Sequence, residues 1–313
     1  MAESSTHTLP PQEAGANPLG GAHLSFIGVG VMAEAIIAGL LKANLVAPSQ
    51  ITGSHPRESR RAELEERYGV RMVESNREAA SVPATAASSE MAKARGAGAG
   101  DTQSPTASSI VVLSVKPQKL GGVMSELRGT LVQEQLVLSI VAGARIETIA
   151  SELLHPAIVR AMPNTPAQIG AGMTVWTPTP QVTETQEVAV RAMLGALGRE
   201  MRVEEERMID MATALSATGP TYVFMMMEAL VDAGVHMGFS RHVAHELVLQ
   251  MILGSVLFAR ESHKHPAELR NMVTSPGGTS AEAIYQMEKG SLRTVLSKAV
   301  YAAYQRALAL GRK

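Results

Sequence analysis

The chain of 313 residues contains no cysteine. This absence excludes disulfide bonds, thiol nucleophiles and cysteine-ligated metal centres, and it leaves the redox compartment of the protein open. Whatever chemistry the protein performs must therefore run without thiols.

An excess of charge of one sign is lacking as well. Lys and Arg number 28 against 29 Asp and Glu, which gives a formal net charge of −1. The chain therefore has no electrostatic footprint for nucleic acid or a membrane surface, and small-molecule partners are favoured. No apolar run reaches the roughly 18 residues of a membrane span. Because residues 1–22 hold neither Lys nor Arg, unlike a signal or transit peptide, we expect a cytoplasmic protein with no membrane partner.

Strand and helix patterns alternate in the first half of the chain, whose total length suggests about two domains. We expect a disordered tail over residues 1–22 and a Rossmann domain over 23–179, with a flexible insertion at 82–109 that is rich in Ala, Ser, Gly and Thr. The predicted strands are Leu24–Ile27, Gln50–Thr52, Ile110–Val115, Leu136–Val141 and Ala157–Ala161, separated by helices such as Met32–Lys42 and Glu58–Arg67. This alternation is typical of a doubly wound, mainly parallel sheet in an α/β fold.

After about Pro180 the strand patterns end, and residues 180–313 are predicted to form an all-α domain. Its predicted helices cover Tyr222–Met237, Arg241 to about Glu261, Ser280–Lys289 and Leu292–Leu310, with Pro220 opening the first, Gly238 ending it and Ser240 capping the second. Met-rich stripes such as Phe224–Met227 are usually core. Their excess here suggests a core shared between subunits, and hence a dimerisation domain.

A dinucleotide-binding pattern opens the first domain. Gly28, Gly30 and Ala33 follow a predicted strand with the spacing Gly-x-Gly-x-x-Ala. Gly28 permits the tight turn, Gly30 lets a pyrophosphate approach the backbone, and Ala33 allows close packing of the helix. We therefore expect a dinucleotide cofactor at the start of this helix.

The acidic residue that selects NADH is missing about 20 residues further on. The chain instead has Ser54–Arg57, with Arg60 and Arg61 close behind. Hydroxyl and cationic side chains suit a 2′-phosphate, so we predict NADPH, with NADH as the alternative. The competing interpretation is that these arginines only solvate a helix face.

The segment Val273–Ser280 places four hydroxyl side chains and two glycines before a predicted helix. Glycines allow close approach of a ligand to the backbone, Thr279 or Ser280 can cap the helix, and the helix start adds N–H donors with a partial positive charge. The pattern predicts an anion site, although an ordinary capped loop has the same composition.

Several motifs together resemble pyrroline-5-carboxylate reductase, over nearly all of the chain from Leu24 to Gly311. The motifs are Phe26–Gly30, Val115–Pro117, Met162–Pro166, Leu215–Pro220 and, most specific to that family, Val273–Ser280. The resemblance implies hydride transfer from NAD(P)H to C5 of the cyclic imine (S)-1-pyrroline-5-carboxylate, giving L-proline, the final step of proline biosynthesis. A protonated imine needs orientation and a water-poor site more than a nucleophile, which agrees with the absence of any evident catalytic triad.

The resemblance also implies positions for the site. For the cofactor they are Ile27, Gly28, Val29, Gly30, Val31, Met32, Ser54, His55, Pro56, Arg57, Asn76, Val115, Lys116, Pro117, Ala142 and Asn164. For the substrate carboxylate they are Glu206, Ser275, Gly277, Gly278, Thr279 and Ser280, with Thr279 and Ser280 as the catalytic pair. It further implies a homodimer, often gathered into a decamer, in which the substrate loop of one chain faces the cofactor of its partner.

Each implied position has a simpler interpretation. Asn76 could cap a helix, Lys116 could be a solvated strand end, and Glu206 could belong to the acidic start of a helix. The chain also departs from the family: Ser280 stands where Thr is usual, Asn271 replaces an Asp usual in bacterial members, and the 82–109 insertion is longer.

Three rival hypotheses remain. His242, His245, His263 and His265 could suggest a metal site, but no carboxylate spacing completes a ligand set and hydride transfer needs no metal, so we expect none. A hydroxyacid dehydrogenase would rely on a Lys in the helical domain, yet no Lys occurs between Lys119 and Lys264. A non-catalytic NADP-binding regulator would have no reason to keep the hydroxyl-rich loop.

Overall fold

A computed structural model describes residues 17–81 and 109–311. The chain forms two compact units, the first ending at Ile209 and the second beginning at Asp210. The predicted tail up to residue 16 and the predicted insertion, apart from Ser109, lie outside the described residues.

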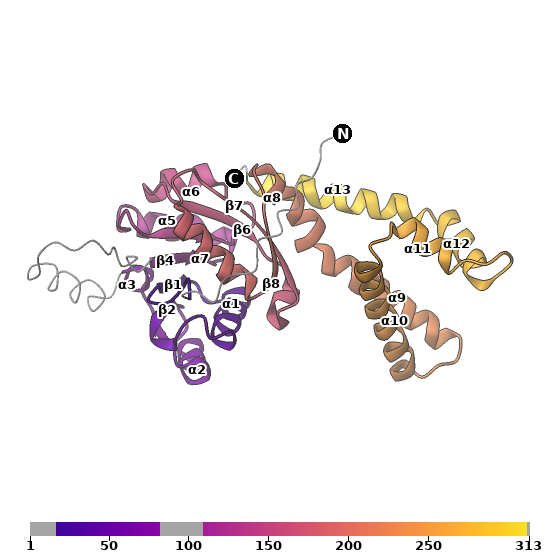
Figure 1. The fold of residues 1–313 in the computed structure, drawn as a ribbon. Helices are drawn as coiled ribbons and strands as arrows, with labels where there is room; N and C mark the ends of the chain where they lie inside the picture. Colours follow the sequence, from indigo (N-terminus) through magenta and orange to yellow (C-terminus); the bar gives the residue numbers. More distant parts are fainter. Residues whose placement is uncertain (1–16, 82–108, 312–313) are drawn as a thin grey trace, which may run out of the picture. The chain divides into compact units, whose positions relative to one another are not determined.

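The first unit is built on an eight-stranded sheet in the order β3-β2-β1-β4-β5-β6-β7-β8 (Figure 1). The strands are β1 (His23–Ile27), β2 (Ile51–Ser54), β3 (Arg71–Val73), β4 (Ser109–Leu113), β5 (Leu136–Ser139), β6 (Ile158–Met162), β7 (Gly172–Pro178) and β8 (Gly198–Arg202). Neighbouring strands are parallel except for β6 and β7. This sheet confirms the predicted doubly wound α/β class.

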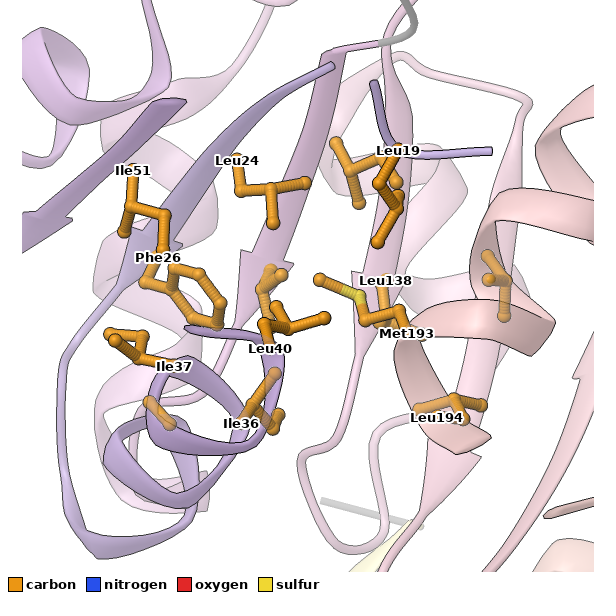
Figure 2. Packing of buried hydrophobic residues seen from close by; sticks show 14 of the residues in the cluster. Leu19, Leu24, Phe26, Ile36, Ile37, Leu40, Ile51, Leu138, Met193 and Leu194 are labelled. Carbon is orange, nitrogen blue, oxygen red and sulfur yellow. The ribbon is translucent and has the colours of Figure 1, made fainter. Parts of the chain in front are cut away.

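Helices cover both faces of the sheet, and the strands are apolar on both sides for that reason. In β4, Ile110 and Val112 pack into one core while Val111 and Leu113 pack into the other. The first core contains side chains from α1 (Val31–Lys42) and α7 (Glu184–Gly195) (Figure 2), and Leu64 from α2 (Glu58–Tyr68). The second contains side chains from α3 (Asn76–Ala80), α5 (Pro117–Leu127) and α6 (Ile146–Leu153).

The first unit extends beyond the limits that the sequence suggested. The expectation that strands end near Pro180 is wrong, because β8 pairs in parallel with β7. The short strand β3 and the strand β7 were also not predicted. Leu19 is fully buried and Ala22 nearly so, although both fall within the predicted tail of residues 1–22. The expected domain boundary after residue 179 differs from the division between the compact units, which falls at Ile209.

The chain passes through α8 (Arg207–Ala212) into the second unit, which is helical. Its further elements are the π-helix η3 (Thr213–Ala217), α9 (Gly219–His236), α10 (Arg241–Ser262), α11 (Pro266–Met272), α12 (Thr279–Lys289) and α13 (Leu292–Leu310). Ser240 caps α10 as predicted, accepting a hydrogen bond from the Val243 N–H at 3.3 Å. Helices α9 and α10 pack through a small apolar cluster of Val231, Ala244 and Val248.

Candidate functional site

The turn after β1 has the geometry that a dinucleotide requires. Gly28 has a φ of +84°, and a Cβ at this position would lie 2.4 Å from Cγ1 of Val115. Gly30 is the N-cap of α1, and a Cβ there would meet nothing within 4 Å. Ala33 is buried against the sheet. The turn is therefore closed at Gly28 and open at Gly30, where a pyrophosphate would approach.

The start of α1 is also electrostatically suited to phosphate. Gly30 provides no side-chain cap, and the N–H groups of Val31 and Met32 have no partner among the described residues. Uncapped amides at a helix start, together with the helix dipole, attract an anion.

The sheet order reverses beside this turn. β1 lies between β2 and β4, so the carboxyl ends of the three strands meet at the topological switch point, where ligands of such sheets bind. Ser114, directly after β4, donates its hydroxyl to the carbonyls of Ile27 and Gly28, at 3.1 Å each. Ser114 was not among the predicted site residues, although a hydroxyl residue directly after a buried strand was the available signal.

The other predicted cofactor positions lie at the ends of neighbouring elements. Lys116 is the N-cap of α5 and Pro117 its first residue. Ala142 lies in the turn after β5. Asn164 is the N-cap of the 3₁₀ helix η2 (Thr165–Ile169), and its Oδ1 accepts the Met173 N–H at 2.9 Å.

Ser54 and Asn76 are joined directly. The buried Ser54 hydroxyl accepts the Gly28 N–H at 3.1 Å and donates to Oδ1 of Asn76 at 2.7 Å. Asn76 does not cap its helix, because Ser75 is the N-cap and accepts the Glu78 N–H. The capping interpretation of Asn76 is therefore wrong.

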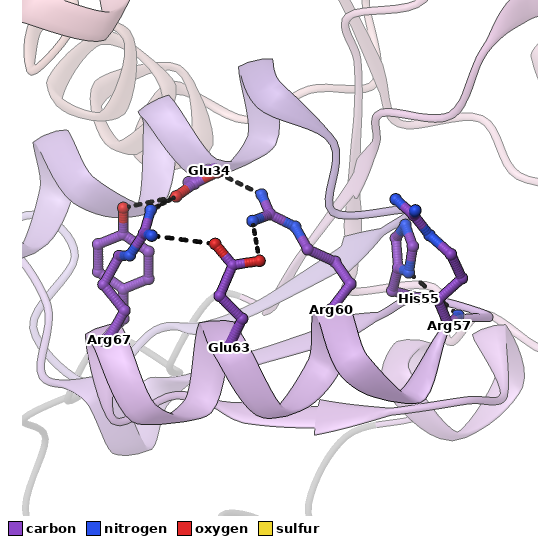
Figure 3. Close-up of polar contacts among 7 residues, drawn as sticks. Glu34, His55, Arg57, Arg60, Glu63 and Arg67 are labelled. Carbon is purple, nitrogen blue, oxygen red and sulfur yellow. Dashed lines mark hydrogen bonds and ion pairs between the residues drawn. The ribbon is translucent and has the colours of Figure 1, made fainter.

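His55 and Arg57 stand side by side after β2 (Figure 3). The Arg57 N–H donates to Nδ1 of His55 at 3.2 Å, so a neutral His55 carries its proton on Nε2. Burial lowers the pKa of His55, and together with the charges of Arg57, Arg60 and Arg61 it outweighs the Arg57 backbone hydrogen bond, which raises that pKa. His55 is thus a neutral donor near pH 7.

The three arginines after β2 have different surroundings. Arg60 forms ion pairs with Glu34 and Glu63, and Arg61 donates to the backbone carbonyls of His55 and Pro56 at 2.8 and 3.1 Å. The guanidinium of Arg57 is exposed and makes no hydrogen bond or ion pair within the described part of the chain. Of the three arginines, Arg57 is therefore the one whose guanidinium is free to bind the 2′-phosphate of NADPH.

In the second unit, the loop between α11 and α12 leaves several donors without partners. Gly277 has a φ of +70°, and Gly278 is the N-cap of α12, so the expectation that Thr279 or Ser280 caps this helix is wrong. No side chain caps the helix, and the N–H groups of Thr279 and Ser280 lack a partner among the described residues. The Thr274 hydroxyl donates to the Arg270 carbonyl at 2.6 Å, which ties down the start of the loop.

Glu206 belongs to the first unit rather than to this loop. Its Oε1 accepts the Ile146 N–H at 2.8 Å, at the start of α6, and pairs with the buried Arg160 at 2.7 Å. One carboxylate oxygen is therefore already engaged by the protein, and substrate binding by Glu206 stays a prediction.

The structure thus gathers most of the predicted cofactor residues at one edge of the sheet, and the predicted loop residues at one helix start. Within residues 17–81 and 109–311, no three His, Asp or Glu side chains gather so that they could hold a metal ion. His242, His245, His263 and His265 all lie within these residues.

Comparison with known proteins adds independent findings. Residues 206–310 match the family model for pyrroline-5-carboxylate reductase dimerisation, and residues 23–87 match one described as NADP oxidoreductase, coenzyme F420-dependent. The pyrroline-5-carboxylate reductase of Synechocystis sp. is 39% identical over 93% of this chain and 98% of its own length.

Solved structures agree with the sequence comparison. A pyrroline-5-carboxylate reductase from Coxiella burnetii is 32% identical with a TM-score of 0.77, covering 93% of this chain and 99% of that one. The Plasmodium falciparum pyrroline carboxylate reductase, solved with NADP bound, is 28% identical with a TM-score of 0.77, covering 93% and 98%. By its sequence and its fold, this chain belongs to the pyrroline-5-carboxylate reductase family.

Proposed function

We propose that the protein reduces (S)-1-pyrroline-5-carboxylate to L-proline with NADPH, the final step of proline biosynthesis. A hydride from the nicotinamide adds to C5 of the protonated imine, the C=N bond becomes a single bond, and NADP⁺ is released. Family membership supports this reaction. The observation that carries it is the pair of unpartnered N–H groups at the start of α12, beside three hydroxyl side chains.

These loop donors suit the carboxylate of the substrate. The N–H groups of Thr279 and Ser280 point out of an uncapped helix start, where the helix dipole favours negative charge. The hydroxyls of Ser275, Thr279 and Ser280 make no hydrogen bond within the described chain and can add further donors. A Cβ on Gly278 would lie 2.4 Å from the Ser275 hydroxyl oxygen, so the backbone here is close to that donor. In this proposal the carboxylate is held while C5 faces the nicotinamide.

The cofactor edge suits NADPH. When bound, the cofactor supplies the hydride. Val31 and Met32 would donate backbone N–H groups to its pyrophosphate, and Arg57 would meet the 2′-phosphate, because Arg60 and Arg61 already have partners. No carboxylate lies at the end of β2 to hold a 2′-hydroxyl in the manner of NADH-selective sites.

We also propose that the protein is a cytoplasmic homodimer, whose dimers gather into a decamer, with each substrate loop facing the partner's cofactor. The second unit matches a dimerisation model, and α10 exposes Leu249, Leu253 and Val256. Helix α10 is also long and apolar enough to cross a membrane, but a single such helix is weak support for a span. A second copy covering this face accounts for the same exposure.

The activity is tested by mixing the purified protein with NADPH and pyrroline-5-carboxylate and following absorbance at the NADPH band. We expect NADPH oxidation with stoichiometric L-proline, and a lower KM for NADPH than for NADH. Ser280→Ala should raise the KM for the imine more than the KM for NADPH, whereas Ser125→Ala, at an exposed position on α5, should change neither. Tight NADPH binding without turnover would instead indicate a non-catalytic regulator.

A further inference from the structure

Four groups form a continuous hydrogen-bonded chain that begins on α5 and ends in the turn after β1. The Glu126 carboxylate accepts Nδ2–H of Asn76 at 2.7 Å, and Oδ1 of Asn76 accepts the Ser54 hydroxyl at 2.7 Å. The Ser54 oxygen accepts the Gly28 N–H at 3.1 Å. The chain thus connects a charged side chain to the backbone of the dinucleotide-binding turn.

The carboxylate at one end fixes the direction of every bond. An ionised carboxylate can only accept, so the amide group of Asn76 must turn its NH₂ toward Glu126 and its oxygen toward Ser54. The Ser54 hydroxyl must then donate to Asn76, which leaves its lone pairs for the Gly28 N–H. Without Glu126, the Asn76 amide could rotate by 180° and reverse the Ser54 hydroxyl.

The direction of these hydrogen bonds is important because Ser54 is buried. Ser54 is fully buried, and a buried polar group without a partner is unfavourable. With the Asn76 amide reversed, the Ser54 oxygen would accept from Asn76 and the Ser54 proton would lose its acceptor, so Ser54 would have to shift and disturb its bond to the Gly28 N–H. Gly28 has little room to move, because Val115 lies against its Cα.

Glu126 also holds the helix that carries Asn76. Its backbone carbonyl accepts Nε–H of Arg77 at 2.6 Å, next to the bond between its side chain and Asn76. Two adjacent residues of α3 are therefore tied to the same residue of α5.

We propose that Glu126 is a positioning residue for NADPH, which sets the direction of the Glu126–Asn76–Ser54–Gly28 chain and thereby the conformation of the pyrophosphate turn. The proposal rests on the function proposed above. It assigns Ser54 an indirect role: its proton goes to Asn76 rather than to the cofactor, so recognition of the adenosine phosphate falls to His55 and Arg57. Asn76 keeps its second amide proton for the nucleotide.

The first experiment measures NADPH affinity by fluorescence titration of full-length protein. Glu126→Ala should weaken NADPH binding by roughly tenfold, the effect of one lost hydrogen bond to a charged group. The kcat at saturating NADPH and the KM for the imine should stay within about twofold. The lost bond weakens the binding of NADPH, and a saturating concentration of NADPH offsets that loss. Glu152→Ala, which removes an exposed carboxylate from α6, is the matched control and should bind NADPH like the wild type. Equal losses in both variants would overturn the proposal.

The second experiment tests the direction itself. In Asn76→Asp, two carboxylates face each other and NADPH affinity should fall. Adding Glu126→Gln to that variant lets a Gln amide donate to the new Asp, which can still accept from Ser54. The same Glu126→Gln change should therefore weaken binding modestly in the wild type but strengthen it several-fold in the Asn76→Asp background.

The outcomes separate this inference from the proposed function. An effect of Glu126→Gln with the same sign in both backgrounds would reject the directed chain while leaving the reductase activity standing. A wild-type protein that binds no NADPH would overturn both. Circular dichroism of each variant guards against loss of fold as the cause.

Discussion

Gly28 and Gly30 are two residues apart, yet a side chain is disfavoured at each for a different reason. At Gly28 the positive φ and the contact with Val115 leave no room for a side chain. At Gly30 the backbone is extended, with φ of −88°, and the space beside it is empty of protein. The first glycine is therefore required by the fold, and we expect the second to be required by the cofactor.

This difference predicts opposite effects of the same substitution. Gly28→Ala should lower the free energy of unfolding by at least ~1–2 kcal/mol, because an L residue is strained at positive φ. Gly30→Ala should leave the free energy of unfolding unchanged but weaken NADPH binding, since its methyl group occupies the approach of the pyrophosphate. Urea denaturation and NADPH titration of both variants check this. A stable Gly28→Ala, or a Gly30→Ala that binds NADPH normally, would contradict it.

Two helices of the first unit are joined by a charged cluster centred on Glu34 of α1. Its carboxylate meets Arg60, Arg67 and Tyr68, all from α2, while Glu63 pairs with both arginines (Figure 3). α2 buries only Leu64 among its own residues. Polar contacts therefore hold α2 against α1, close to the end of β2 where His55 and Arg57 stand.

The cluster makes the stability of this element depend on pH. Burial raises the pKa of Glu34, but hydrogen bonds from Arg60 and Tyr68 and the arginine charges outweigh it, so the pKa lies below its usual value. A lowered folded-state pKa means that the carboxylate stabilises the fold above the unfolded pKa of 4.5 and ceases to do so as pH falls through the lower value. Glu34→Gln should destabilise the protein by about 1–2 kcal/mol at pH 7.

The measurement is the free energy of unfolding of wild type and Glu34→Gln between pH 7 and pH 3. We expect the difference between them to shrink as pH falls below about 4.5. Glu66→Gln, an exposed change on the same helix without a partner in the described chain, should show little difference at any pH. A Glu34→Gln difference that is independent of pH would argue against the ion-pair cluster.

At the scale of the whole molecule, the two units bury their side chains to very different degrees. The first unit has two extensive cores on either side of its sheet, whereas α9 and α10 share a cluster of only a few buried residues. The exposed apolar side chains of α9 and α10 include Phe224, Met225, Leu253 and Val256. A second unit with so little core of its own needs another surface to cover it.

The sequence predicted elements best where local chemistry and burial agree. The run Ile110–Leu113 is apolar throughout and forms most of β4, although the predicted strand ran on to Val115, and Leu292–Leu310 became α13 with the same limits. Strand β8 was missed because Gly198–Arg202 is partly exposed and charged, so only its pairing with β7 makes it a strand. Strand β3 was missed because it is short and partly exposed, and its pairing with β2 makes it a strand.

The residues of the candidate site also fall into those that a local pattern reveals and those that only the fold brings together. The fingerprint fixed Gly28 and Gly30 from local spacing alone. Glu126 could not be found, because its partner Asn76 lies 50 residues away in the sequence. Ser114 had a local signal in its place after a strand, but its partner Ile27, 87 residues away, had none. Contacts of that range follow from the order of the strands, which no local pattern encodes.

The last prediction concerns the exposed face of α10. Val256→Glu places a charge on an apolar residue that is 61% exposed in the single chain and takes no part in the cluster between α9 and α10. If a second copy covers this face, burying the new carboxylate is unfavourable and the oligomer should dissociate.

Val132→Glu, the same change at a 48% exposed position in the first unit, is the matched control. Light scattering should show a smaller mass for Val256→Glu only, with helical circular dichroism retained. Reductase activity should also be lost, because in the proposed arrangement each site needs the partner's loop. Val256→Glu of unchanged mass would reject α10 as the interface, and a fully active monomer would reject the site shared between two chains.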